Sequence, residues 1–176
     1  MKLGYVVIAA AVGIASIFAV SWIMNQHNKP RPRTRVLILC TGNSCRSIMA
    51  EAIWRHLAGD RYEVQSAGTH PKTVHPLALR VLAERGISTE GLWSKAVDEV
   101  DTSHLDIVIT VCDSARDQCP YLPGNFQRLH WPFDDPPAYQ GTEEEKLAVF
   151  RRVRDEIWEK IAEFLQTEAD ASARSR

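Results

Sequence analysis

The chain has 176 residues and a formal net charge of −1, with 45% hydrophobic and 24% charged residues. This length allows one domain of ordinary size plus an additional segment. The near-zero charge gives no strong field that would attract nucleic acid, so we predict no nucleic-acid partner.

The first predicted element is an apolar segment at the N-terminus. Residues 4–24 carry no charged side chain, and a helix of about 20 apolar residues is long enough to cross a bilayer core. We therefore predict a transmembrane anchor over residues 1–27, which contacts the membrane through residues 4–24. A cleaved secretory signal is the alternative, although the apolar region of such signals is usually shorter, at about 7–15 residues.

A short basic segment follows and indicates the orientation of the anchor. Residues 28–34 contain Pro30 and Pro32, which is typical of a stiff linker. Several basic side chains flank the apolar segment on this side, and the positive-inside rule places such a flank in the cytoplasm. We therefore predict a single-pass protein of the inner membrane, with its C-terminal domain in the cytoplasm, where cysteines stay reduced.

From residue 35 onward, strand and helix patterns alternate. Continuous apolar runs such as RVLILC (35–40) are typical of buried parallel strands, and the last helix has clear helical spacing of apolar residues. We predict strands at 35–40, 62–66, 105–111 and 126–131, and helices at 47–58, 75–85 and 142–164. The alternation predicts an α/β fold, with a three-layer parallel-sheet domain at 35–167 and a polar tail at 168–176.

Three reactive side chains follow predicted strands. Cys40 ends the first strand, Cys112 ends the third, and Asp135 follows the fourth. Ligands of open α/β sheets bind outside the carboxyl ends of the strands. If the strands run parallel, these side chains lie at one edge of the sheet and form the candidate site.

The segment CTGNSCRS, from Cys40 to Ser47, lies between a predicted strand and a predicted helix. In that position successive backbone N–H groups point inward and form an anion nest at a helix N-terminus. Arg46 adds a planar guanidinium that matches two oxyanion oxygens. Ser47 is placed to donate to a Cys40 thiolate, and Gly42 permits an unusual backbone angle. The predicted oxyanion-binding residues are Thr41, Gly42, Asn43, Ser44, Cys45, Arg46 and Ser47.

These motifs resemble a known family. CTGNSCRS is similar to the active-site loop of the low-molecular-weight protein tyrosine phosphatase superfamily, and SAGTHP (66–71) and FDDP (133–136) support the resemblance. The chain is most similar to the thioredoxin-coupled arsenate reductases, because it also has VCDSARDQCP (111–120) and HWPFDDP (130–136). The resemblance implies a phosphatase-like domain, arsenate or another phosphate-like oxyanion as substrate, thioredoxin as electron donor, and no cofactor.

The resemblance also implies a reaction sequence. Cys40 attacks arsenic, and Asp135, which directly precedes the proline as the acid of the family does, protonates the departing hydroxyl. Cys112 then attacks the Cys40 sulfur and arsenite is released, after which Cys119 attacks Cys112 and regenerates Cys40. Thioredoxin reduces the Cys112–Cys119 disulfide. The predicted catalytic residues are Cys40, Arg46, Cys112, Cys119 and Asp135.

Other interpretations of these residues stay open. A protein tyrosine phosphatase needs only Cys40, Arg46 and an acid, and Cys112 and Cys119 would then protect Cys40 from over-oxidation. A membrane-held oxyanion or redox sensor is a third interpretation, but a sensor has no need of the acid Asp135. Zinc binding is not favoured because the cysteine spacings lack a Cys-x2-Cys pair, and we predict no metal site.

At position 95 this sequence has a lysine where some of the related reductases have an acidic residue. Some of them hold a monovalent cation beside the active-site loop, with residues equivalent to Asn43, Glu51 and Ser66 and one acidic side chain. Alignment without gaps from Ser66 to Cys112 puts Lys95 at the acidic position. Its ammonium would take the charge role of the ion, pairing with Glu51 and steadying the loop through Asn43. An exposed lysine is the alternative.

Overall fold

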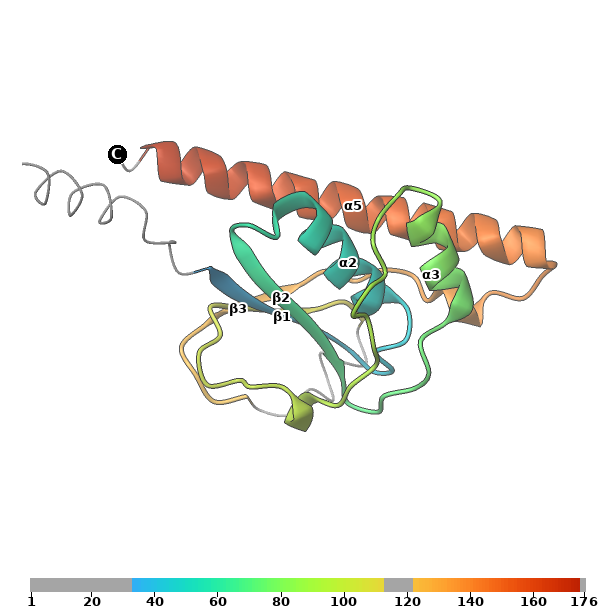
Figure 1. Cartoon of the computed structure of the whole chain (residues 1–176), viewed down its shortest axis with the longest axis horizontal. Helices are drawn as coiled ribbons and strands as arrows, with labels where there is room; N and C mark the ends of the chain where they lie inside the picture. The colour runs from blue at the N-terminus through green and yellow to red at the C-terminus, as the bar shows by residue number, and fades with distance from the viewer. Residues whose placement is uncertain (1–32, 113–121, 175–176) are drawn as a thin grey trace, which may run out of the picture. The chain divides into compact units, whose positions relative to one another are not determined.

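A parallel β-sheet forms the centre of the domain in the computed structural model (Figure 1). The structure describes residues 33–112 and 122–174, and within them four strands lie in the order β2-β1-β3-β4, each parallel to its neighbours. Their bounds are Thr34–Cys40 for β1, Tyr62–Gly68 for β2, Ile107–Thr110 for β3 and Gln127–His130 for β4. The predicted α/β class and parallel sheet are confirmed.

The strand register brings the carboxyl ends of the strands to one edge of the sheet. Ile38 of β1 pairs with Ser66 of β2 and with Ile109 of β3. The chain leaves β1 directly after Cys40, and it reaches Cys112 shortly after the end of β3. The loop entered at Cys40 is therefore at the edge where ligands of parallel sheets bind.

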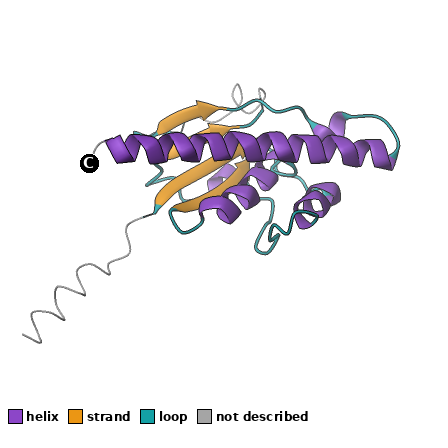
Figure 2. Cartoon of the chain, turned by 90° about the horizontal axis from the view of Figure 1, so that it is seen from above, coloured by secondary structure: helices purple, strands orange, loops and turns teal. Residues whose placement is uncertain are grey.

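Three helices pack together on one face of the sheet. They are α2 (Arg46–Ala58), α3 (Pro76–Ala83) and α5 (Glu143–Arg174). Val36 and Ile38 of β1 point into the core that these helices share, together with the large buried side chains of Trp54 and Phe150. Figure 2 shows α5 as a long helix that passes over the strands.

The opposite face of the sheet has its own small core. Leu37 and Leu39 of β1 pack there with Val97 and Val100. In the part of the chain that the structure describes, the short helix η1 (Val97–Glu99) and its neighbouring segments cover this face. Since β1 is covered on both faces, its residues form a continuous apolar run and do not alternate with polar ones.

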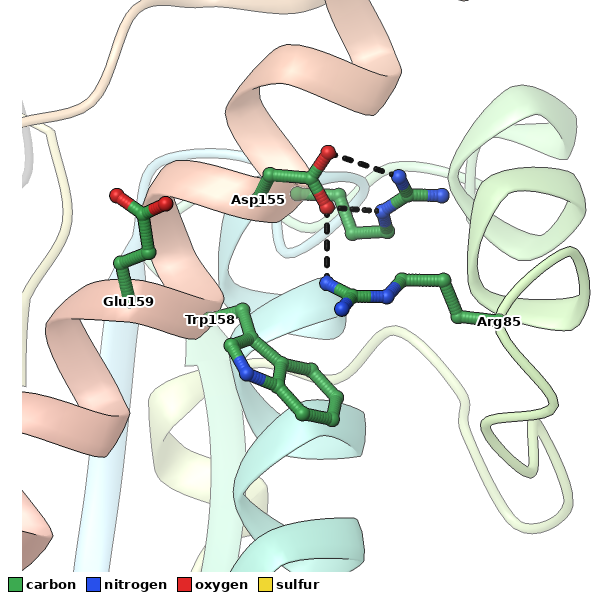
Figure 3. Close-up of a pocket in the computed structure, with 5 residues that line it drawn as sticks. Arg85, Asp155, Trp158 and Glu159 are labelled. Carbon is green, nitrogen blue, oxygen red and sulfur yellow. Dashed lines mark hydrogen bonds and ion pairs between the residues drawn. The ribbon is translucent and has the colours of Figure 1, made fainter.

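The end of α3 is joined to α5 by ion pairs around a groove (Figure 3). Asp155 of α5 contacts Arg154 at 2.9 Å and Arg85 at 2.9 Å, and these guanidinium groups lower the pKa of Asp155. The Arg85 guanidinium also lies over the Trp158 ring, 4.2 Å from its centre. Buried Arg154 donates to the Val81 carbonyl at 2.8 Å, which fixes α3 against α5.

The helix α5 extends further than its apolar pattern predicts. Its last buried residue is Leu165, close to the predicted end at 164, but the helix continues to Arg174. Residues 168–174, predicted as a frayed polar tail, form its last exposed turns. Alanine and glutamate are strong helix formers, which explains why the helix persists there without an apolar face.

The predicted localisation needs correction. The predicted anchor, residues 1–27, and most of the predicted linker, 28–34, lie outside the described residues. Within the ranges that the structure does describe, no helix is both long and apolar enough to cross a membrane. The longest of them, α5, carries charged side chains along its exposed face. The prediction of a single-pass protein of the inner membrane is therefore wrong as far as the described chain goes.

Candidate active site

The loop between β1 and α2 holds the candidate nucleophile. Cys40 is the last residue of β1 and is buried, with 3% of its surface exposed. Its Sγ accepts a hydrogen bond from the Asn43 backbone N–H at 3.1 Å and lies 2.9 Å from the Oγ of Ser47, in the first turn of α2. A sulfur anion at this position therefore accepts hydrogen bonds from both the loop and the helix, as predicted for Ser47.

A second segment of backbone, residues 69–75, runs along the outside of this loop. Its amide groups bind the carbonyl groups of the loop in four pairs: Thr69 to Cys40 at 3.3 Å, His70 to Thr41 at 2.8 Å, Lys72 to Gly42 at 2.8 Å and His75 to Ser44 at 2.8 Å. The Ser44 hydroxyl also donates to the Thr73 carbonyl at 2.8 Å. Because its carbonyls are held on the outside, the loop has its own amide groups left to face an anion.

The positive backbone angle of the loop lies at Asn43 and not at Gly42. Asn43 has φ +39°, whereas Gly42 is not among the residues with positive φ. Asparagine tolerates this left-handed region better than most residues, so the loop needs no glycine there. At Gly42 a Cβ would lie 3.7 Å from the Lys72 side chain, an ordinary contact. The backbone freedom that Gly42 permits is therefore not used for a positive φ.

The Asn43 side chain connects the loop to the rest of the domain. It is fully buried, and its Nδ2 donates to Ser47 at 3.0 Å and to Ser66 of β2 at 2.8 Å. Its Oδ1 accepts from the Lys95 backbone N–H at 2.8 Å. All polar groups of this amide are thus engaged, which holds the loop in one shape.

A buried charge cluster lies behind Asn43. Glu51 of α2 is fully buried and accepts a hydrogen bond from the Ser66 backbone at 2.9 Å. Lys95 is 4% exposed, with its Nζ 3.8 Å from a Glu51 carboxylate oxygen. The pairing of Lys95 with Glu51 is thus present, and the alternative of an exposed lysine is wrong. Burial lowers the pKa of Lys95, and the attraction of Glu51 opposes this shift.

Arg46 joins the loop to the turn that follows β4. Its Nη2 lies 2.9 Å from Asp135 Oδ1, and its Nη1 donates to the Phe133 carbonyl at 3.0 Å. The neighbouring carboxylate, Asp134, points instead to Arg152 of α5 at 2.9 Å. The structure therefore brings Asp135, and not Asp134, to the predicted oxyanion loop.

The other cysteines differ in their relation to the loop. Cys112 is buried, and its Sγ lies 3.5 Å from the Thr41 hydroxyl, so a second thiol is beside the loop. Cys45 is also buried, and burial raises the pKa of its thiol, which keeps it protonated at neutral pH. Cys119 lies outside the described residues.

Several groups of this site carry little or no signal in the sequence. The 69–75 segment acts through main-chain amides, which residue types do not reveal. Arg55 forms a second ion pair with Glu51, and only the spacing of four positions on a helix indicated it. Trp93 is 51% exposed, and its ring centre lies 4.7 Å from the Lys95 Nζ. The Lys95 Nζ also donates to the backbone carbonyl of Trp93 at 3.3 Å.

The assembled groups define the chemistry of the site. A buried thiol stands at the base of a loop of backbone amides, with a guanidinium and a half-exposed carboxylate at its rim. This set is suited to nucleophilic attack on the central atom of a tetrahedral oxyanion. Among the described residues, no group of three or more His, Cys, Asp or Glu side chains is arranged to hold a metal ion.

Comparison with known proteins identifies the family. The model of the low molecular weight phosphotyrosine protein phosphatase family matches residues 35–173. The chain therefore belongs to this family, and the resemblance carried by CTGNSCRS, SAGTHP and FDDP is confirmed.

The relatives found within the family are mainly arsenate reductases. One from Halalkalibacterium halodurans is 46% identical over 132 residues, which are 75% of this chain and 95% of that protein. A solved arsenate reductase in the phosphate binding state is 28% identical, with a TM-score of 0.62 over 76% of this chain and 98% of its own. A thioredoxin-dependent arsenate reductase from Corynebacterium glutamicum is 30% identical, with a TM-score of 0.54 over 85% and 72%.

Proposed function

We propose that this protein is an arsenate reductase in which Cys40, Cys112 and Cys119 form a thiol–disulfide relay that thioredoxin recycles. The observation that carries the proposal is the position of Cys112. Its thiol is buried beside the oxyanion loop, 3.5 Å from the Thr41 hydroxyl. A phosphatase has no need of a second thiol there, whereas reduction of arsenic from the +5 to the +3 state needs two electrons. The names of the relatives support the same activity.

The first chemical step uses the loop and its rim. The oxyanion is bound by the loop amides and by Arg46. The Cys40 sulfur attacks arsenic, and the departing hydroxyl takes a proton from Asp135 and leaves as water. This step forms a sulfur–arsenic bond and breaks an arsenic–oxygen bond, and arsenic stays in the +5 state.

The second step reduces arsenic. Cys112, as a thiolate, attacks the Cys40 sulfur and forms a Cys40–Cys112 disulfide. The electron pair of the sulfur–arsenic bond passes to arsenic, which leaves as arsenite in the +3 state. Cys119 then attacks Cys112, releases the Cys40 thiolate and leaves a Cys112–Cys119 disulfide. Thioredoxin, named in the C. glutamicum relative, supplies the two thiols that reduce it.

Hydrolysis of a phosphotyrosine-type ester is the second candidate function. The family model itself describes phosphatases, and the groups that such a reaction needs are all present. In this case Cys40 attacks phosphorus, Asp135 protonates the leaving oxygen, and water releases phosphate. Neither Cys112 nor Cys119 takes part in turnover, and this difference separates the two candidates.

The test follows arsenate-dependent NADPH consumption with thioredoxin and thioredoxin reductase, beside hydrolysis of a phosphotyrosine analogue. We expect wild-type protein to consume NADPH over many turnovers, and Cys40→Ser to lose both activities. Cys112→Ser and Cys119→Ser should lose multiple-turnover reduction and keep whatever hydrolysis the wild type has. If Cys119→Ser reduces arsenate at the wild-type rate with thioredoxin, the relay is incorrect and a phosphatase or another thiol donor takes precedence.

A further inference from the structure

The two terminal nitrogens of the Arg46 guanidinium already have partners in the structure. One terminal nitrogen contacts the Asp135 carboxylate at 2.9 Å and the other donates to the Phe133 carbonyl at 3.0 Å. The Arg46 side chain is 14% exposed and that of Asp135 is 48% exposed, so the pair lies at the opening of the loop. The side chain expected to hold an oxyanion is therefore held by a carboxylate of the same chain.

A carboxylate and a tetrahedral oxyanion bind a guanidinium in the same way. Each offers negatively charged oxygens that accept hydrogen bonds from the planar fork of N–H groups. An oxyanion that binds across the two terminal nitrogens of this fork meets the same nitrogens that the 133–135 turn contacts in the observed arrangement. Asp135 and the oxyanion consequently compete for Arg46, in addition to repelling each other as like charges.

We propose that Asp135 is an internal competitor of the oxyanion: its carboxylate occupies Arg46 until an entering anion displaces it. Displacement separates the Asp135 carboxylate from its cation, and the carboxylate must then take a proton from solvent before it can protonate the leaving oxygen. Asp135 thus lowers the affinity of the loop for any tetrahedral anion, and it becomes available to the reaction only when the loop is filled. This inference rests on the proposed function only in taking the loop as an oxyanion site.

The chain provides a matched control for this effect. Asp134 is the adjacent residue and carries the same charge, but its side chain is bound to Arg152 at 2.9 Å and not to Arg46. A general effect of negative charge near the opening would involve both residues. Competition for Arg46 would involve Asp135 alone.

The experiment measures sulfate binding by isothermal titration calorimetry at constant pH and ionic strength. Sulfate is a tetrahedral dianion that the enzyme does not turn over, so the result is independent of catalysis. Asp135→Asn keeps an oxygen that accepts from Arg46 but removes the charge, and Asp135→Ala removes both. We expect sulfate to bind about three- to tenfold more tightly to Asp135→Asn than to wild type. Asp135→Ala should bind it at least as tightly as Asp135→Asn, and Asp134→Asn should stay within about twofold of wild type.

The possible results separate this inference from the proposed function. If the wild type binds sulfate and neither Asp135 variant binds it more tightly, the inference is overturned. The proposed function is not affected by that result. Equal tightening in Asp134→Asn would also overturn the inference, because the effect would then be one of general charge. If none of the proteins binds sulfate, the oxyanion site and the inference both fail. Thermal melts of the four proteins establish that each is folded. The two Asp135 variants measure the effect of the Asp135 carboxylate on sulfate affinity independently of each other.

Discussion

A single buried carboxylate, Glu51, is shared by two cations. Arg55 follows it by one helical turn, and Lys95 approaches from the segment before η1. Both Lys95 and Glu51 are also connected to the loop between β1 and α2. The Lys95 backbone binds Asn43, and Glu51 binds Ser66, a second partner of Asn43. The charge at position 95 is therefore expected to affect the shape of the loop.

Lys95→Asp should make activity depend on potassium. In the wild type, Lys95 supplies the positive charge beside Glu51, so arsenate reduction should be nearly equal in potassium and sodium at equal ionic strength. The variant places two carboxylates together, which favours a bound monovalent cation. We expect at least about fivefold higher activity of Lys95→Asp in potassium than in sodium, on the order of 1 kcal/mol.

Lys95→Met provides the control for this prediction. It removes the ammonium without adding a carboxylate, so its activity should fall without a response to potassium. Clear activation of the unmutated protein by potassium would contradict the idea that Lys95 takes the place of an ion.

Some residues of the candidate site can be found from the sequence and others cannot, and the reason is physical. Cys40, Arg46 and Asp135 are found from short motifs because their spacing is set within one loop or one turn. The Asn43 side chain holds the loop in place, and the positive φ also lies at Asn43 and not at Gly42. Glycine is the usual residue at such an angle, and only the surrounding hydrogen bonds make asparagine the residue that adopts it.

Among the elements, α3 is directly connected to the loop between β1 and α2. Its N-cap residue, His75, accepts a hydrogen bond from the Leu77 backbone N–H at its Nδ1, at 3.2 Å. The backbone N–H of His75 donates to the Ser44 carbonyl, and its ring packs on Phe150 at 4.7 Å between centres. The start of α3, the loop and α5 therefore meet at this one residue.

Protonation of His75 should weaken this junction. Nδ1 can accept a hydrogen bond only when it is unprotonated, and burial lowers the pKa of His75 from its ordinary value of 6.5. The unfolded chain therefore takes up the proton first. The stability that neutral His75 provides is complete above pH 6.5 and is lost as the pH falls from there through the lower folded-state pKa.

The variants His75→Asn and His75→Ala test this expectation by urea unfolding between about pH 5 and pH 8. Asparagine caps helices but does not titrate, so His75→Asn should show a smaller loss of unfolding free energy on acidification than wild type. His75→Ala lacks a cap and should lose about 1 kcal/mol at pH 8. Equal pH slopes for wild type and His75→Asn would exclude the proposed contribution of His75.

On the scale of the whole molecule, burial on α5 ends well before the helix does. Leu165 is the last buried residue, and the following turns to Arg174 expose all of their side chains. Apolar spacing predicted where the contact with the core ends, but it could not predict where the helix ends. The hydropathy of residues 4–24 likewise led to a membrane localisation that no described helix supports.

Deletion of residues 168–176 should therefore have little effect on stability. The removed turns bury no side chain of their own in the described part of α5, so the unfolding free energy should change by less than about 0.5 kcal/mol. Leu165→Ala, one turn earlier, should cost about 2 kcal/mol because it leaves a cavity in the core. Urea unfolding followed by circular dichroism measures both. A loss above about 1 kcal/mol on deletion would mean that these turns pack against another surface in solution.

The hydrogen bonds between residues 69–75 and the loop between β1 and α2 determine what must be included if this site is grafted into another protein. The observed form of CTGNSCRS depends on four amide groups of residues 69–75, which follow β2. A graft of the eight-residue motif into another strand–loop–helix unit would carry the thiol and the guanidinium but no partners for the loop carbonyls. Those carbonyls would be free to turn inward, where they repel an anion. A working graft must therefore include the backbone of both segments, held at their native separation.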